Sequence, residues 1–167
     1  MQKNFRHSLT KQKTVTTLLF PGYQNQTPGM SFEFPFEYAI AGEFGRLFYP
    51  IVQLQLKTIA GWKTFEFLVD TGADITTVST SLLPILGITQ STLRLSTTFG
   101  VGGFSVKTWN FSLPIRIGTY ELSIAASAVE ISGDSMPFLL GRKDIFEDHW
   151  NLLIDSKRKV TVLSENK

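Results

Sequence analysis

The chain of 167 residues has no cysteine and only two histidines, and these absences exclude several kinds of functional site. Without cysteine it has no disulfide, no thiolate nucleophile and no sulfur ligand for a metal. His7 lies in a polar N-terminal stretch, and His149 stands beside Trp150, where a structural or surface role is the simpler interpretation. We therefore expect neither a metal nor another cofactor.

The chain also has little net charge and no long apolar run. The net charge is +2, which is too small to indicate a nucleic-acid partner. No apolar run approaches the roughly 20 residues that a helix needs to span a bilayer. The short run at residues 18–20 does not make a secretory signal. We expect no membrane span and a cytoplasmic location.

The chain does have a composition that can bury a core, with 43% apolar residues in a length typical of one domain. The composition changes near residue 43. Upstream, residues 22–30 are rich in turn formers, and Pro35 interrupts an alternating stretch that suits an edge strand or an extended arm. We therefore predict a partly mobile N-terminal arm at residues 1–43 and one domain at residues 44–167.

The N-terminal arm carries several basic residues before the first acidic residue, Glu33. This pattern leaves an organelle-targeting or anionic-surface role open beside the simpler interpretation, a polar mobile arm. The basic residues are Lys3, Arg6, Lys11 and Lys13.

Downstream of residue 43, apolar residues alternate with polar ones, which is the period of a half-buried strand. Residues 52–57 and 65–69 form the clearest pair, and Ala60-Gly61 between them predicts a hairpin. Many short strands and one short helix indicate an all-β barrel or sandwich. Further strands are expected at 75–79, 93–99, 104–117, 120–124, 151–155 and 159–163, with a helical turn or two at 81–87 and a two-turn helix at 142–148.

The stretch FLVDTGADITTVS at residues 67–79 places Asp70 at the end of an apolar strand. Burying an ionised carboxylate costs several kcal/mol unless it is paired or its pKa is tuned. Asp-Thr-Gly alone is a weak signal, because these residues are common in turns, where Asp70 would only accept backbone N–H groups. Two later segments add weight: a glycine-rich stretch at 97–106 and FLLGR at 138–142.

These three segments, in this order and spacing, resemble the retropepsin-like aspartic proteases, the family of the retroviral proteases and their cellular relatives. The resemblance covers about residues 47–163. It implies an all-β, closed retropepsin-like barrel with a flap hairpin and one short C-terminal helix, acting as a homodimer. The matching parts are LVDTGAD at 68–74, TTFGVGGFSV at 97–106, FLLGRKDIF at 138–146 and NLLIDSKRKVTVL at 151–163.

The chemistry of such a protease needs two carboxyl groups. Hydrolysing a peptide bond without a metal, a Ser–His pair or cysteine requires a base to activate water and an acid to protonate the carbonyl. At ~3.5 Å and an effective dielectric constant of ~20, two carboxylates repel each other by ~5 kcal/mol, which corresponds to more than about three pKa units. One carboxyl therefore keeps its proton while the other stays ionised.

The sequence contains no good second copy of the aspartate motif. Asp155 follows an apolar run, but Lys157 stands where glycine is needed, and only 12 residues follow Asp155. Asp134 lacks both the apolar approach and the glycine. In a two-fold dimer a residue on the axis meets its own copy, so we expect Asp70 to face Asp70 of a second chain.

The resemblance implies a role for each residue of the loop. Asp70, Thr71 and Gly72 form the catalytic set, in which the Thr71 hydroxyl bonds across the dimer. Gly72 lets the backbone approach the substrate, because a side chain would block the cleft. Together with Gly72, Ala73 and Asp74 are expected to bind the substrate.

Two further segments support this loop in the family pattern. The Asp74 carboxylate is expected to pair with Arg142 in a bidentate, partly buried contact, with Gly141 as a further supporting residue. A solvated charge is the alternative for Arg142. The flap tip would bind the substrate backbone through its amides, and an ordinary hairpin turn is the alternative. Its residues are Gly100, Val101, Gly102 and Gly103, flanked by Phe99 and Phe104, which would shape the cleft or pack across the strands.

The sequence therefore predicts an aspartic endopeptidase that cleaves extended peptide or protein substrates and prefers apolar side chains. The alternative is a catalytically weak or silent dimerisation and peptide-binding module of the same fold. A third interpretation, a small β-barrel binding protein with a coincidental turn, leaves the three ordered segments unexplained.

Overall fold

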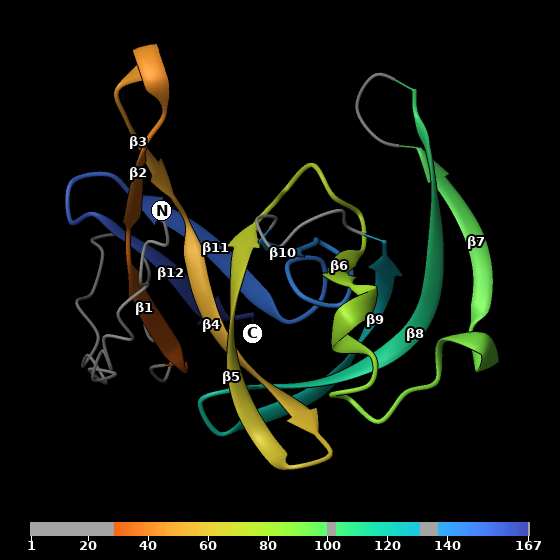
Figure 1. Ribbon diagram of the computed structural model, residues 1–167. Coiled ribbons are helices and arrows are strands. Elements are labelled where there is room, and N and C mark those ends of the chain that lie inside the picture. The colour runs from red at the N-terminus through yellow and green to blue at the C-terminus, as the bar shows by residue number, and fades with distance from the viewer. Residues whose placement is uncertain (1–28, 100–102, 131–136, 167) are drawn as a thin grey trace.

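A computed structural model describes residues 29–99, 103–130 and 137–166 (Figure 1). Strands dominate these residues, which confirms the all-β fold class. Helical structure within them is limited to short 3-10 segments at Gly42–Phe44, Thr80–Leu82 and Gln90–Thr92. No helix in the described ranges is long and apolar enough to cross a membrane.

One sheet of seven strands forms most of the body. Its order is β4-β5-β10-β6-β9-β8-β7, and a further pairing of β4 with β8 closes the sheet on itself. The β5–β10 and β6–β9 pairings are parallel. The strands are β4 (Ile51–Thr58), β5 (Gly61–Val69), β6 (Thr76–Ser79), β7 (Arg94–Phe99), β8 (Ser105–Ile117), β9 (Tyr120–Val129) and β10 (Phe138–Leu140).

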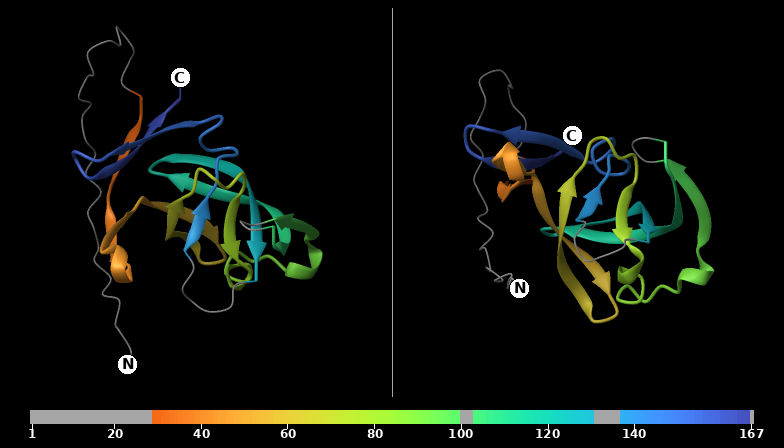
Figure 2. Two further views of the ribbon diagram at one scale, coloured as in Figure 1. Left: turned by 90° about the horizontal axis from the view of Figure 1, so that it is seen from above. Right: turned by 45° about the horizontal axis from the view of Figure 1, so that its top comes forward.

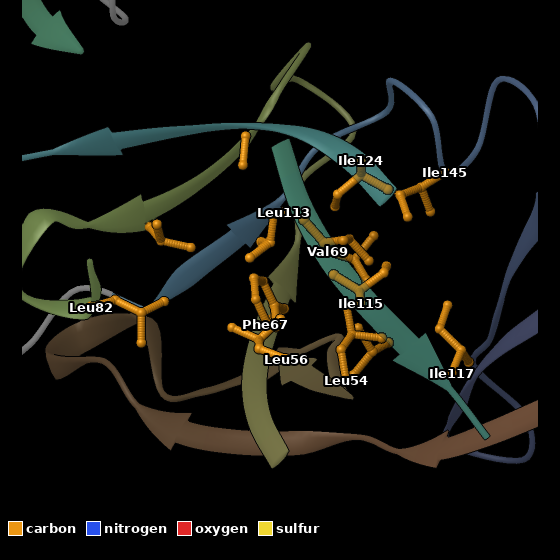
Figure 3. Packing of buried hydrophobic residues seen from close by; sticks show 14 of the residues in the cluster. Leu54, Leu56, Phe67, Val69, Leu82, Leu113, Ile115, Ile117, Ile124 and Ile145 are labelled. Carbon is orange, nitrogen blue, oxygen red and sulfur yellow. The ribbon is translucent and has the colours of Figure 1, made fainter. Parts of the chain in front are cut away.

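The alternation seen in the sequence decides which side chains fill the barrel. Val52, Leu54 and Leu56 of β4 are fully buried. Burying one such side chain stabilises the fold by roughly 1.5–3 kcal/mol relative to leaving it exposed. The core therefore fixes the register of β5, the strand that leads into Asp70. Figure 3 shows the residues of β5 and β8 that complete this cluster: Phe67, Val69, Leu113, Ile115 and Ile117.

A second sheet, of three strands in the order β1-β12-β11, lies beside the barrel (Figure 2). Its strands are β1 (Ser31–Pro35), β11 (Trp150–Asp155) and β12 (Val160–Glu165). β1 is an edge strand that ends at Pro35, as the sequence indicated. In the chain, β2 (Glu37–Ile40) and β3 (Arg46–Tyr49) come between β1 and β4 and form a two-stranded hairpin.

The domain boundary predicted between residues 43 and 44 falls inside the β2–β3 hairpin. Upstream of it, β1 pairs with β12 along its whole length, and Phe34 is buried with an exposure of 8%. Residues 31–40 are therefore attached to the folded body. Residues 1–28 lie outside the described ranges, so the mobility expected of them stays a prediction.

The helix predicted at residues 142–148 is wrong. These residues form hydrogen-bonded turns, one of which joins the Phe146 N–H to the Arg142 carbonyl at 2.9 Å. Asp144 has a φ of 62°, a left-handed conformation that interrupts a right-handed helix. The Asp144 carboxylate accepts a hydrogen bond from the Ala125 N–H of β9 at 2.7 Å. This tertiary contact holds the turn in its non-helical shape.

Candidate active site

The loop that carries Asp70 begins where β5 ends, at one end of the barrel (Figure 1). On one side of β5, the Val69 N–H donates to the carbonyl of Pro50 at 3.0 Å. On the other side, the Asp70 N–H donates to the carbonyl of Leu140 at 3.1 Å. The backbone that presents the carboxylate is therefore fixed by both neighbouring strands.

The Asp70 carboxylate is partly buried and lies within a tight turn. Its Oδ1 accepts a hydrogen bond from the Gly72 N–H at 2.9 Å. The backbone carbonyl of Asp70 accepts a second one from the Ala73 N–H at 3.1 Å. A side chain at Gly72 would place its Cβ 3.2 Å from Asp70 Oδ1, which is a tight contact. Glycine thus leaves room for the carboxylate as well as for anything that approaches the loop.

Three further loop residues lie where a binding partner can reach them. Thr71 and Gly72 are exposed, and Ala73 is partly exposed. Asp70 accepts a backbone N–H within a turn, which the sequence analysis gave as the alternative to a catalytic role. It leaves the loop accessible, so the turn role and a catalytic role are compatible.

Asp74 and Arg142, 68 positions apart, form an ion pair between Asp74 Oδ1 and Arg142 Nη2. The expected bidentate, partly buried geometry is wrong, because a single nitrogen makes the contact and the two side chains are 80% and 46% exposed. Exposed pairs of this kind contribute about 0–1 kcal/mol. The backbone holds the segments more firmly: the N–H groups of Arg142 and Lys143 donate to the carbonyls of Ala73 and Asp74 at 3.0 and 2.9 Å.

Gly141 is required by close packing. A Cβ there would lie 2.5 Å from the carbonyl carbon of Ile75 and 2.7 Å from the nitrogen of Thr76. The Gly141 N–H donates to the Thr76 hydroxyl at 3.2 Å, and Thr76 is fully buried. The sequence interpretation missed Thr76. The available signal was that Thr76 lies on the same strand face as Val78, so a polar residue stands on a face that is normally apolar.

The β7–β8 hairpin rises from the same end of the molecule as the Asp70 loop (Figure 1). Phe99 and Phe104 near its tip are 75% and 76% exposed, so packing within the chain does not bury them. Gly103 is exposed and has a φ of 77°. The other predicted tip residues, at 100–102 and including Val101 and Gly102, lie outside the described residues.

Asp155, which the sequence had weighed as a second catalytic aspartate, belongs to the β11–β12 turn. Its carboxylate accepts hydrogen bonds from the Lys157 and Arg158 N–H groups at 3.0 and 2.9 Å, and from Arg158 Nε at 2.6 Å. These bonds, chiefly those from Arg158, lower the pKa of Asp155 below its ordinary value. Asp134 lies outside the described residues. Within the described ranges, no cluster of three or more acidic or histidine side chains is arranged to hold a metal ion.

Comparison with protein families shows which family the chain belongs to. The family model described as "Aspartyl protease" matches residues 57–143, which include Asp70, the β7–β8 hairpin and Arg142. The chain belongs to the aspartyl protease family. No curated protein sequence matches this family member significantly.

Comparison with a solved structure shows that this aspartyl protease family member has the retropepsin-like fold. A retropepsin-like aspartic protease from Rickettsia conorii is similar with a TM-score of 0.52 and 18% identity, covering 84% of this chain and all of that one. A structure of EIAV protease with the inhibitor HBY-793 matches with a TM-score of 0.43 and 22% identity, covering 56% of this chain and 82% of that one. At 18% identity, the likeness to the Rickettsia conorii protease shows the fold.

Proposed function

We propose that this aspartyl protease family member is a homodimeric endopeptidase, with one Asp70 contributed by each copy. The observation that carries the proposal is the Asp70 turn. It presents a carboxylate at the end of a barrel strand, fixed by the carbonyls of Pro50 and Leu140, and the sequence holds one Asp-Thr-Gly per chain. A general acid and a general base then require two copies.

In the proposed mechanism the two Asp70 carboxyls share one proton. The ionised carboxylate takes a proton from a water molecule, whose oxygen attacks the scissile carbonyl, while the protonated carboxyl donates its proton to the carbonyl oxygen. The tetrahedral gem-diol then passes a proton to the amide nitrogen, and the C–N bond breaks. No acyl-enzyme forms, because water rather than a side chain attacks the carbonyl carbon.

The proposed substrate is an extended peptide, because Thr71 and Gly72, which follow the Asp70 carboxylate, are exposed to a partner. The β7–β8 hairpin extends from the same end of the barrel as this loop. The exposed rings of Phe99 and Phe104 support a preference for apolar side chains. We propose that this hairpin is the flap that covers the peptide.

Cleavage of a peptide library with and without pepstatin, analysed by mass spectrometry, tests the proposal. Asp70→Asn is expected to lower kcat/KM by about a thousandfold or more while leaving the melting temperature nearly unchanged. Asp148→Asn is the matched control, because the same substitution at an exposed position outside the Asp70 loop leaves the proposed chemistry intact. Undiminished cleavage by the Asp70→Asn protein contradicts the mechanism, and binding without cleavage by the wild type favours a silent peptide-binding module.

A further inference from the structure

The β2–β3 hairpin carries a concentration of exposed apolar side chains. In the described part of the chain its two strands pair only with each other. It holds five of the twelve large apolar side chains that are exposed there, which makes it an exception to the usual polar surface. They are Tyr38 (38% exposed), Ile40 (79%), Phe44 (76%), Leu47 (40%) and Phe48 (45%).

The base of this hairpin lies next to the Asp70 loop. β3 ends at Tyr49, and the following carbonyl, that of Pro50, accepts the N–H of Val69, the residue before Asp70. A strand rises about 3.3 Å per residue, so Phe48 is roughly 7 Å along the chain from Pro50. Figures 1 and 2 show the Asp70 loop between two projecting hairpins, β2–β3 on one side and β7–β8 on the other.

The hairpin is attached firmly enough to act as a preformed surface. The Phe36 N–H at its root donates to the Lys159 carbonyl at 2.9 Å, and the Phe36 ring stacks on Phe48 with centroids 4.5 Å apart. Farther out, the Arg46 guanidinium lies 3.7 Å from the centre of the Tyr38 ring. A surface that is ordered before binding loses less conformational entropy when a partner covers it.

We propose that the β2–β3 hairpin is an intersubunit arm, covered by a second copy of this chain in the dimer. The inference rests on the proposed function, in which one chain holds half of the site. A copy that brings its Asp70 within a few ångströms of this one has to lie beside Pro50, where the hairpin begins. The arm thus makes assembly of the carboxylate pair and burial of its apolar residues a single event.

The exposed edge strand β11 is the competing surface. Leu153 and Ile154 on it are 43% and 41% exposed. The hairpin is favoured, because its exposed apolar side chains are more numerous and three of them are more exposed than either of these two. Its base also adjoins the Asp70 loop, through the hydrogen bond from the Val69 N–H to the Pro50 carbonyl.

Sedimentation velocity of matched aspartate variants tests the arm. Ile40→Asp places a charge on the hairpin, and Ile59→Asp places the same charge on the β4–β5 turn, where Ile59 is 76% exposed. We expect Ile40→Asp to raise the dimer dissociation constant by about tenfold or more, and Ile59→Asp to leave it within about twofold. Equal dimerisation of Ile40→Asp and wild type overturns the proposal.

Hydrogen exchange of the unmodified protein gives a second readout that does not depend on a variant folding. Amides of residues 37–49 are expected to gain protection as the protein concentration is raised through the dimer dissociation constant. Protection gained instead only by β11, or concentration-independent protection of residues 37–49 by the chain's own N-terminal segment, overturns the proposal.

A cleavage assay separates failure of the arm from failure of the proposed function. Pepstatin-sensitive cleavage by both wild type and Ile40→Asp, with unchanged dimerisation, leaves the endopeptidase standing and removes the arm. Dimerisation that Ile40→Asp weakens, without any cleavage by the wild type, leaves the arm standing and removes the endopeptidase.

Discussion

The backbone N–H of Asp70 donates a hydrogen bond to the carbonyl of Leu140 at 3.1 Å, and Gly141 follows directly. The candidate catalytic loop and the FLLGR segment are therefore neighbours on one ladder, although about seventy residues separate them in the chain. Their spacing is decided mainly by backbone contacts, so substitutions that disturb the backbone should matter more than loss of the exposed ion pair.

Gly141→Ala is expected to destabilise the fold by about 1–3 kcal/mol, since the new methyl group overlaps backbone atoms of Ile75 and Thr76 that cannot move independently. Chemical denaturation measures this loss. The same variant should cleave more slowly, because β10 supports Asp70. A Gly141→Ala protein as stable as the wild type would show that β6 and β10 are not so closely packed.

Thr76→Val is expected to cost about 1–3 kcal/mol in unfolding free energy, because it leaves the Gly141 N–H without its acceptor while preserving side-chain shape. Thr76→Ser is the control. It keeps the hydroxyl and loses one buried methyl group, so it should retain the hydrogen bond from the Gly141 N–H. Amide exchange at Gly141 should therefore be faster in the Thr76→Val protein and unchanged in the Thr76→Ser protein. Equal exchange at Gly141 in both variants contradicts the assigned role.

The Asp74–Arg142 pair is expected to show a coupling free energy below about 1 kcal/mol in a double-mutant cycle of Asp74→Asn and Arg142→Gln. The Asp74 side chain is 80% exposed and the Arg142 side chain 46% exposed, so raising the salt concentration should reduce the coupling further. A salt-insensitive coupling of several kcal/mol would mean that the pair is buried in the assembled protein.

The Asp155 carboxyl has a pKa lowered by its bonds to Arg158, so it should contribute stability at neutral pH. A depressed carboxyl pKa stabilises the fold above the unfolded-state pKa, and the contribution is lost as pH falls through the folded-state pKa. Asp155→Asn should therefore melt at a lower temperature than wild type at pH 7, and the difference should shrink at acidic pH. Asp148→Asn, on the exposed surface, serves as the control.

The Glu37 carboxyl behaves in the opposite sense. Desolvation and the neighbouring charge of Glu66 raise its pKa, so ionising it opposes folding. Stability associated with this group is highest below the unfolded-state pKa, about 4.3, and falls as pH rises through the folded-state value. Glu37→Gln should melt above wild type at pH 7 and match it near pH 3. A lower melting temperature at pH 7 contradicts this assignment.

The sequence predicted what depends on local pattern. The alternation at residues 52–57 and 65–69 corresponds to β4 and β5, which pair from Ile51↔Leu68 to Thr58↔Gly61. The turn at residues 142–149 could not be predicted, because the left-handed Asp144 depends on a bond to Ala125 on a distant strand.

The candidate site divides in the same way. Asp70, Thr71 and Gly72 were identifiable because the motif is contiguous. The need for glycine at position 141 arises from Ile75 and Thr76, which only the folded chain brings near. The β2–β3 hairpin was missed because its connection depends on the positive φ angles of Gly42 and Gly45. In the sequence, these glycines were noticed only as part of a change in composition near residue 43.

The most direct test of the central claim, two Asp70 residues in one site, is cleavage by mixtures of wild type and Asp70→Asn. Total protein concentration is held constant, well above the dimer dissociation constant, while the wild-type fraction varies. A shared site predicts activity proportional to the square of that fraction, about a quarter at equal parts, because mixed dimers have one ionisable carboxyl. Activity directly proportional to the wild-type fraction, about half at equal parts, would contradict the shared site.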